Sequence, residues 1–165
     1  MKVKFRPMIS SDWNSVVTIY KQGIETGNAT FEKEIPSWEA WDSAHLKTCR
    51  IVATIDRIIV GWAALSPVSG RCVYDGVAEV SVYVSEQYKD HKIGTRLLEQ
   101  LVSESEISGL WTLQASIFPE NRASIRVHEK MGFRQVGYRE KIGKMDGVWR
   151  DTILLERRSK VTGIV

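Results

Sequence analysis

The order of apolar and polar positions predicts a chain in which strands and helices alternate. Val3 and Phe5 alternate with charged residues, as in a short strand with one buried face. Apolar residues then recur at helical spacing over residues 13–20 and, later, over residues 97–102. A short helix is expected after Pro36-Ser37, and the apolar runs on either side of Asp56-Arg57 predict a β-hairpin.

The second half of the chain continues this alternation. Residues 78–84 predict a strand with valines on one face and Glu79, Ser81 and Tyr83 on the other. A strand over residues 110–118, a helix over 121–131 and two strands around Asp146-Gly147 complete the order. Strands interspersed with helices favour an α/β fold of the α+β type, with helices on both faces of a mixed sheet.

Length and composition are those of an ordinary globular protein. The 165 residues are 43% hydrophobic and 26% charged, without repeat or linker, so residues 1–165 predict a single domain. A net charge of +3 without a basic block argues against nucleic acid as a partner. Two cysteines and three scattered histidines predict no disulfide framework and no metal site. No signal-peptide pattern and no apolar run near ~18 residues is present, so we expect a cytoplasmic protein without membrane contact.

Residues 79–98 carry the clearest chemical signal. A strand leads through a polar loop into an amphipathic helix, whose first amides lack internal partners and can bind an anion. Gly94 permits close approach to the backbone, and Lys89, Lys92 and Arg96 add positive charge. The nucleotide-binding pattern GxxxxGK[ST] is absent. An ordinary connection with solvated lysines would explain the same segment, and the segment alone does not decide between the two.

Asn121 to Phe133 supplies a second motif. Lys89-Asp-His-Lys-Ile-Gly94 resembles the pyrophosphate loop Q/R-x-x-G-x-G/A of the GNAT N-acetyltransferase superfamily, and residues 121–133 resemble its N-x-x-[SA]-x-x-[LV]-Y-E-K-x-G-F signature. Shorter stretches resemble the branch that acetylates phosphinothricin and methionine sulfoximine: Thr30-Phe31, residues 71–75, residues 78–84 and residues 146–151. The resemblance covers nearly the whole chain.

The resemblance implies acetyl-CoA-dependent acetylation of the amino group of a small amino acid analogue, by direct transfer and without a metal. It also implies a homodimer and a mostly antiparallel central sheet. The coenzyme contacts that it implies are Val82, Tyr83, Val84, Lys89, Asp90, His91, Lys92, Ile93, Gly94, Thr95, Asn121 and Ser124, with Asn121 on the pantetheine arm.

Three positions depart from the family pattern, the first of them Lys89, which stands where arginine or glutamine is usual. Lys92 stands where the first glycine of the loop is usual, and His128 stands where many members carry tyrosine. Because residues other than glycine avoid the left-handed region, we expect a negative φ at Lys92. Its side chain would either contact a phosphate or crowd the loop.

Glu79 and His128 are the candidate catalytic residues. A carboxylate in so apolar a strand is costly to bury unless it is paired, and it could serve as a general base, directly or through water. His128 lies on the inward face of its helix, and the resemblance places it near the coenzyme sulfur, where it would protonate the thiolate. Tyr83 is the alternative acid. A paired structural carboxylate and a satisfied core histidine are the corresponding interpretations without catalysis.

Arg71 is the candidate that would recognise the substrate's carboxylate, since a guanidinium can hold it through two parallel hydrogen bonds. Phe31 and Tyr74 would wall the aliphatic part of the substrate, and Gly27-Asn28 is typical of a mobile segment beside them. Two other functions remain open. A protein or peptide N-acetyltransferase on the same fold would need an open groove, and a non-catalytic acyl-CoA-binding module would not need Glu79.

Overall fold

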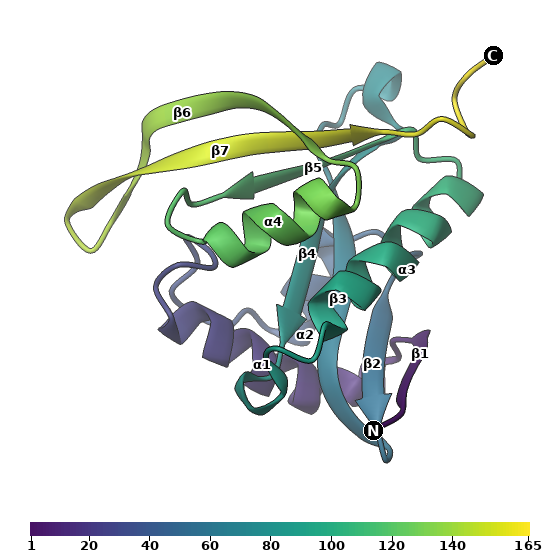
Figure 1. Ribbon diagram of the computed structural model, residues 1–165, viewed down its shortest axis with the longest axis vertical. Coiled ribbons are helices and arrows are strands. Elements are labelled where there is room, and N and C mark those ends of the chain that lie inside the picture. Colours follow the sequence, from purple (N-terminus) through teal and green to yellow (C-terminus); the bar gives the residue numbers. More distant parts are fainter.

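A seven-stranded sheet forms the centre of the computed structural model, which describes residues 1–165 (Figure 1). β4 and β5 are parallel, and every other neighbouring pair is antiparallel. This confirms the expected mixed, mostly antiparallel sheet. In spatial order the strands are β1 (Val3–Pro7), β2 (Ile51–Ile55), β3 (Ile58–Pro67), β4 (Val77–Val84), β5 (Thr112–Ile117), β7 (Val148–Arg158) and β6 (Arg134–Met145).

Helices cover both faces of the sheet, as the sequence predicted. α1 (Trp13–Glu25) and α2 (Trp38–Ala44) pack on one face, while α3 (Ile93–Ile107) and α4 (Arg122–Lys130) pack on the other (Figure 1). Short 3-10 turns lie at Ser10–Asp12, Cys72–Tyr74 and Glu86–Tyr88. The length and hydropathy of these helices fall short of what a membrane span requires.

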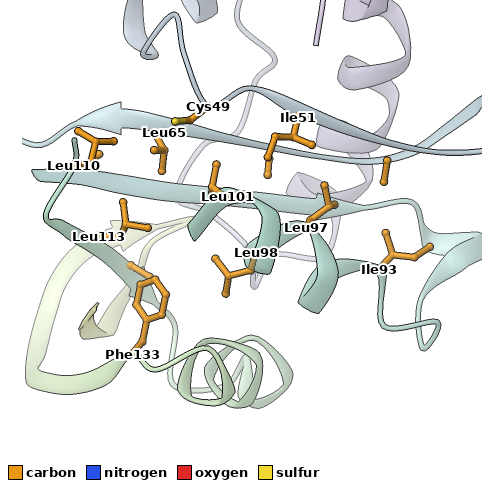
Figure 2. Close-up of a cluster of buried hydrophobic side chains, with 14 of the residues drawn as sticks. Cys49, Ile51, Leu65, Ile93, Leu97, Leu98, Leu101, Leu110, Leu113 and Phe133 are labelled. Atoms are coloured by element: carbon orange, nitrogen blue, oxygen red, sulfur yellow. The ribbon is translucent and has the colours of Figure 1, made fainter. Parts of the chain in front are cut away.

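Each face has its own hydrophobic core because side chains alternate along the strands. The larger core lies under α3, where Leu97 and Leu101 point toward the strands and Leu98 lies on the side of Phe133 (Figure 2). The smaller core lies under α1 and α2 and is rich in aromatic residues, with Tyr20, Trp41 and Trp62 buried together. On β3, Trp62 faces the smaller core and its neighbour Ala63 faces the larger one.

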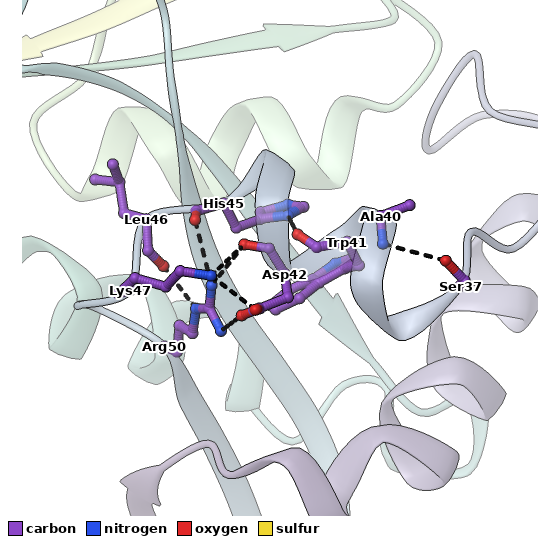
Figure 3. Close-up of polar contacts among 8 residues, drawn as sticks. All are labelled: Ser37, Ala40, Trp41, Asp42, His45, Leu46, Lys47 and Arg50. Atoms are coloured by element: carbon purple, nitrogen blue, oxygen red, sulfur yellow. Dashed lines mark hydrogen bonds and ion pairs between the residues drawn. The ribbon is translucent and has the colours of Figure 1, made fainter.

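Arg50 ties the short helix α2 to the start of β2. Its guanidinium donates to Asp42 Oδ1 at 2.6 Å and to the carbonyl oxygens of Asp42, His45 and Leu46 (Figure 3). The same guanidinium lies over the ring of Trp41, with 5.0 Å between its Cζ and the ring centroid. A seven-residue helix is marginal by itself, so these contacts supply much of its support.

The two parallel strands separate in the middle of the sheet. β4 and β5 pair only at Val77, Ala78 and Glu79, whose partners are Thr112, Leu113 and Gln114. From Val80 onward, β4 pairs with β3 on one side and has no strand on the other. The separation leaves a row of unpaired backbone amides and carbonyls in the centre of the molecule, and the candidate site lies there.

Candidate active site

A pocket of about 260 Å³ opens where β4 and β5 separate. Its walls come from the α1–α2 connection, β4, β5, the β5–α4 connection, α4 and β7. None of the lining residues is a lysine or an arginine. They are Ala29, Thr30, Phe31, Glu79, Val80, Ser81, Val82, Tyr83, Ala115, Ser116, Ile117, Phe118, Asn121, Ser124, His128 and Thr152.

The pocket connects the two faces of the sheet. Glu79 lies on the same face of β4 as Tyr83, which packs against the smaller core under α1. His128 belongs to α4, which lies on the opposite face. The gap between the strands therefore allows the two candidate catalytic residues, predicted from separate motifs, to line one cavity.

Glu79 is half-buried and hydrogen-bonded on one oxygen only. Gln114 Nε2 and Ser116 Oγ both donate to Oε1, each at 3.3 Å. Both partners lie on β5, so the carboxylate bridges the strands just where they separate. Oε2 has no protein donor, which leaves it free to accept a proton from a molecule in the pocket.

His128 is buried, with 6% of its surface exposed. Its Nδ1 lies 2.7 Å from the carbonyl oxygen of Ser124, an acceptor, so Nδ1 carries a proton and donates it there. The neutral ring then has its lone pair on Nε2. Burial lowers the pKa of His128 below its usual value, with the bond to Ser124 opposing this shift. An acid role therefore requires that the ring first accept a proton.

The lowered pKa of His128 has a consequence for stability. Burial lowers the pKa of His45 in the same way, so the unfolded chain binds protons more readily than the folded one at both positions. We expect the free energy of unfolding to have its full value above about pH 6.5, where histidine is neutral in both states. It should decrease as the pH falls below that value. Urea denaturation of the wild type and of His128→Phe between about pH 5 and pH 8 measures this. A variant with the wild-type pH dependence would contradict the assignment to His128.

The other strand residues predicted to contact the coenzyme divide between the two faces. Val82 and Val84 point to the larger core, and Val82 lines the pocket. Tyr83 points the opposite way and stacks on Trp62, with 4.8 Å between ring centroids. Burial raises the pKa of Tyr83, so the phenol stays protonated and is a weak acid. Only the backbone of Tyr83 can contribute on the side of the valines.

The polar loop ends in a helix N-terminus, as an anion site requires. α3 begins at Ile93. The first helical hydrogen bond runs from the Arg96 N–H to the carbonyl oxygen of Lys92, at 3.1 Å. The amides of Ile93, Gly94 and Thr95 precede it and are free to bind an anion. A Cβ at Gly94 would lie 3.5 Å from Val84, so this turn packs directly against the end of β4.

The expected negative φ of Lys92 is wrong. Lys92 has φ 59° and ψ 18°, in the left-handed region, and Asp90 also has a positive φ. The chain must turn sharply from the 3-10 turn at Glu86–Tyr88 into α3, and the position before the helix adopts the conformation that glycine adopts most easily. Lys92 is exposed, so its side chain does not clash with the fold. Lys89 pairs with Glu86 at 2.6 Å, and His91 is exposed beside it.

Replacing Lys92 separates backbone strain from charge. We expect Lys92→Gly to raise the free energy of unfolding by about 1 kcal/mol because the left-handed strain disappears. We expect its dissociation constant for CoA to rise about threefold because an exposed ammonium contributes up to ~1 kcal/mol to an ion pair. Lys92→Ala removes the charge but keeps the strain, and is the matched control. Tighter CoA binding by Lys92→Gly would mean instead that the side chain crowds the loop.

Asn121 and Ser124 form the start of α4. Asn121 Oδ1 accepts from the Ser124 N–H at 3.3 Å, and Asn121 Nδ2 donates to the Asn28 carbonyl at 3.2 Å. One N–H of the amide group remains for a ligand. Ser124 Oγ lies 3.5 Å from His128 Nδ1. Asn121 therefore has two structural roles that the sequence did not indicate.

The structure separates the three predicted substrate residues. Phe31 lines the pocket and packs edge-on against Phe118. Arg71 and Tyr74 do not line it: both are exposed on the β3–β4 connection, with the guanidinium 5.7 Å from the Tyr74 ring. This connection leads into the end of β4 that carries Glu79.

Sequence reasoning missed several residues that build the pocket. Ser116, Phe118 and Thr152 line it, and Arg150 supports its wall from behind. Side chains alternate along β5, so Ser116 lies on the same face as Gln114, the residue that pairs with Glu79. Arg150 lies in the stretch 146–151 that carries the resemblance, but no local pattern could have indicated its partners at Gly27 and Asn28, more than a hundred residues away.

Comparison with known proteins gives a consistent result. The profile of the acetyltransferase (GNAT) family matches residues 13–133. The chain is 29% identical to a phosphinothricin N-acetyltransferase of Streptomyces viridochromogenes, over 94% of this chain and 87% of that one. It is 25% identical to a methionine sulfoximine/methionine sulfone acetyltransferase of Pseudomonas aeruginosa, over 94% of each chain.

A solved structure resembles the fold over its whole length. The phosphinothricin acetyltransferase of Sinorhizobium meliloti, crystallised with acetyl-CoA, superposes with a TM-score of 0.87 at 28% identity. The match covers 100% of this chain and 96% of that one. The free amides at the start of α3, the unpaired edge of β4 and the pocket between the strands suit a diphosphate, an amide-containing arm and a reacting thioester, respectively. The chain belongs to the acetyltransferase (GNAT) family and is an N-acetyltransferase that uses acetyl-CoA.

Proposed function

We propose that this enzyme acetylates the amino group of a small amino acid analogue of the phosphinothricin or methionine sulfoximine type. The observation that carries the proposal is the single pocket lined by Glu79 from one face of the sheet and His128 from the other. The names of the curated relatives supply the substrate class. The fixed wall formed by Ala29, Thr30 and Phe31 supports a small substrate over a peptide, which would need an open groove.

Two side chains carry the proton transfers in this proposal. Glu79 Oε2 takes a proton from the substrate ammonium, so that the free amine can attack the thioester carbon and the carbon–sulfur bond can break. His128 begins neutral, accepts a second proton from the attacking nitrogen and returns it to the departing thiolate. The three backbone amides of residues 93–95 hold the diphosphate, and the pantetheine arm lies along the free edge of β4 and near Asn121.

A thiol-release assay tests the proposal. The purified enzyme and acetyl-CoA are mixed with amino acids, sulfoximine, sulfone and phosphinate analogues, polyamines and an N-terminal peptide. We expect release with the small analogues and none with the peptide. Free CoA should raise the melting temperature, because a ligand that binds only the folded state stabilises it. Thermal stabilisation without turnover of any small analogue would contradict the substrate class. No stabilisation at millimolar CoA would contradict the coenzyme site.

The proposal includes a homodimer and a single domain over residues 1–165. The β6–β7 hairpin presents exposed apolar side chains that a second copy could cover: Val136, Tyr138, Ile142, Val148 and Trp149. Two of the six tryptophans, Trp41 and Trp62, are buried in the smaller core and so cannot contribute to such an interface. Sedimentation at micromolar concentration tests the dimer, and a species near 18.8 kDa would contradict it.

The proposal also includes a cytoplasmic location. Cys49 is buried, Cys72 is exposed, and neither forms a disulfide, as is usual for a reducing compartment. Cell fractionation would test this part separately.

A further inference from the structure

The connection between α1 and α2 is attached to the second half of the chain, although Gly27-Asn28 indicated a mobile segment. Arg150 Nη1 donates to the Gly27 carbonyl at 2.9 Å, and Arg150 Nη2 donates to Asn28 Oδ1 at 2.9 Å. Asn121 Nδ2 donates to the Asn28 carbonyl at 3.2 Å. Lys33 forms an ion pair with Asp146 farther along the connection. These contacts favour a connection that is held in place.

Arg150 is the centre of this attachment. Its side chain is 15% exposed, and its guanidinium lies over the Phe118 ring, with 4.0 Å between Cζ and the ring centroid. A third polar contact joins Nη2 to Glu120 Oε2 at 3.4 Å. The guanidinium thus joins β7, the β5–α4 connection and the α1–α2 connection in one place. A lysine could not reproduce this set, because only the planar fork donates in several fixed directions while its face rests on a ring.

The residues that follow the attachment form one wall of the pocket. Ala29, Thr30 and Phe31 line the cavity, whereas Arg150 does not. Phe31 packs on Phe118, with 4.8 Å between ring centroids, and Phe118 is the ring under the Arg150 guanidinium. Phe31 also lies against Gly143, where a Cβ would approach its ring to 2.7 Å. The position of the wall therefore depends on contacts with β6 and β7, outside the two family motifs.

We propose that Arg150 is a positioning residue for the amine substrate, holding residues 27–31 so that Ala29, Thr30 and Phe31 form one wall of the pocket. This inference rests on the proposed function, because it assigns the wall to the amine and not to the coenzyme. Arg150 touches neither Glu79 nor His128, so it acts on substrate binding through the connection. Without the guanidinium, residues 27–31 regain conformational freedom. Ordering them when the substrate binds then costs entropy, which weakens substrate binding.

Steady-state kinetics of Arg150→Met test the proposal. Methionine keeps the length and apolar stem of the side chain and removes the donors. We expect the KM for the amine to rise about tenfold, with kcat and the CoA dissociation constant each within about twofold. Arg150→Lys should recover only part of the loss. Arg134→Met is the matched control, since Arg134 is exposed on β6 and pairs only with Glu156, and its KM should equal the wild-type value.

Asn28→Ala extends the test if Arg150→Met folds poorly. Asn28→Ala deletes only the Oδ1 acceptor, so we expect a smaller rise in KM than for Arg150→Met. The KM of the double variant should equal that of Arg150→Met, because the contact with Oδ1 is already lost there. Losses that fall on kcat with KM unchanged, or that only follow the fraction of unfolded protein, would overturn the proposal. So would equal KM values for Arg150→Met and Arg134→Met.

Hydrogen exchange distinguishes failure of this inference from failure of the proposed function, because it needs no substrate. We expect Arg150→Met to speed amide exchange over residues 27–33 relative to Arg134→Met, with α3 unchanged. If the wild type acetylates no small analogue but exchange increases as expected, the attachment stands and the substrate class fails. If exchange over residues 27–33 is the same in the two variants, Arg150 does not position the connection and the inference is overturned.

Discussion

Glu79→Gln is expected to lower turnover by ~10²–10⁴ near neutral pH, because glutamine keeps the shape of the side chain and cannot accept the ammonium proton. The free Oε2 is the reason for expecting so large an effect: the carboxylate has its two protein donors on Oε1 and is open to the pocket on the other oxygen. The loss should shrink as the pH rises, since more of the substrate amine is then already deprotonated.

The control for this prediction is Glu129→Gln. Glu129 is exposed on α4 and hydrogen-bonds Gln135, so its loss removes the same charge from the chain without changing the pocket. Circular dichroism of both variants must show the wild-type fold before rates are compared. A folded Glu79→Gln enzyme with wild-type turnover would make Glu79 a structural carboxylate that joins β4 to β5.

Arg71→Leu is expected to raise the KM for the amino acid at least thirtyfold, or about 2 kcal/mol, with the KM for acetyl-CoA within twofold. An α-amino acid brings a carboxylate, and none of the residues that line the pocket is a lysine or an arginine. Arg71 forms no ion pair within the chain, and its connection leads directly into β4. For this role the substrate's carboxylate must extend beyond the pocket lining to the β3–β4 connection, where the guanidinium is free of protein carboxylates.

The carboxamide of the same substrate provides the test of mechanism. It should be a poor substrate of the wild type and lose little more with Arg71→Leu, because the group that the arginine would bind is already neutral. Arg57→Leu, at the exposed β2–β3 turn, is the matched variant on the surface. Equal effects on acid and amide, or none on either, would show that Arg71 does not read the carboxylate.

Local patterns predicted the elements because each is a statement about neighbours along the chain. The valines of residues 80–84 alternate as a strand requires, and the leucines of 97–101 recur as a helix requires, and both patterns were confirmed. The start of α3 after the polar loop was predicted for the same reason, because the loop and the first turn of the helix are consecutive in the chain. The sign of φ at Lys92 was predicted wrongly, because the geometry of the turn into α3 determines it and the residue type does not.

The sequence by itself determined the order of elements, the two faces of β4 and the candidates Glu79 and His128. Tertiary structure alone decided that these two residues share a pocket, since that depends on β4 and β5 separating after three paired residues. It also decided that Asn121 and Arg150 hold the connection at Asn28, while Arg71 lies outside the pocket lining. The physical reason is distance along the chain. Arg150 and Asn28 are 122 positions apart, and only the packing of the whole sheet brings such groups within hydrogen-bonding distance.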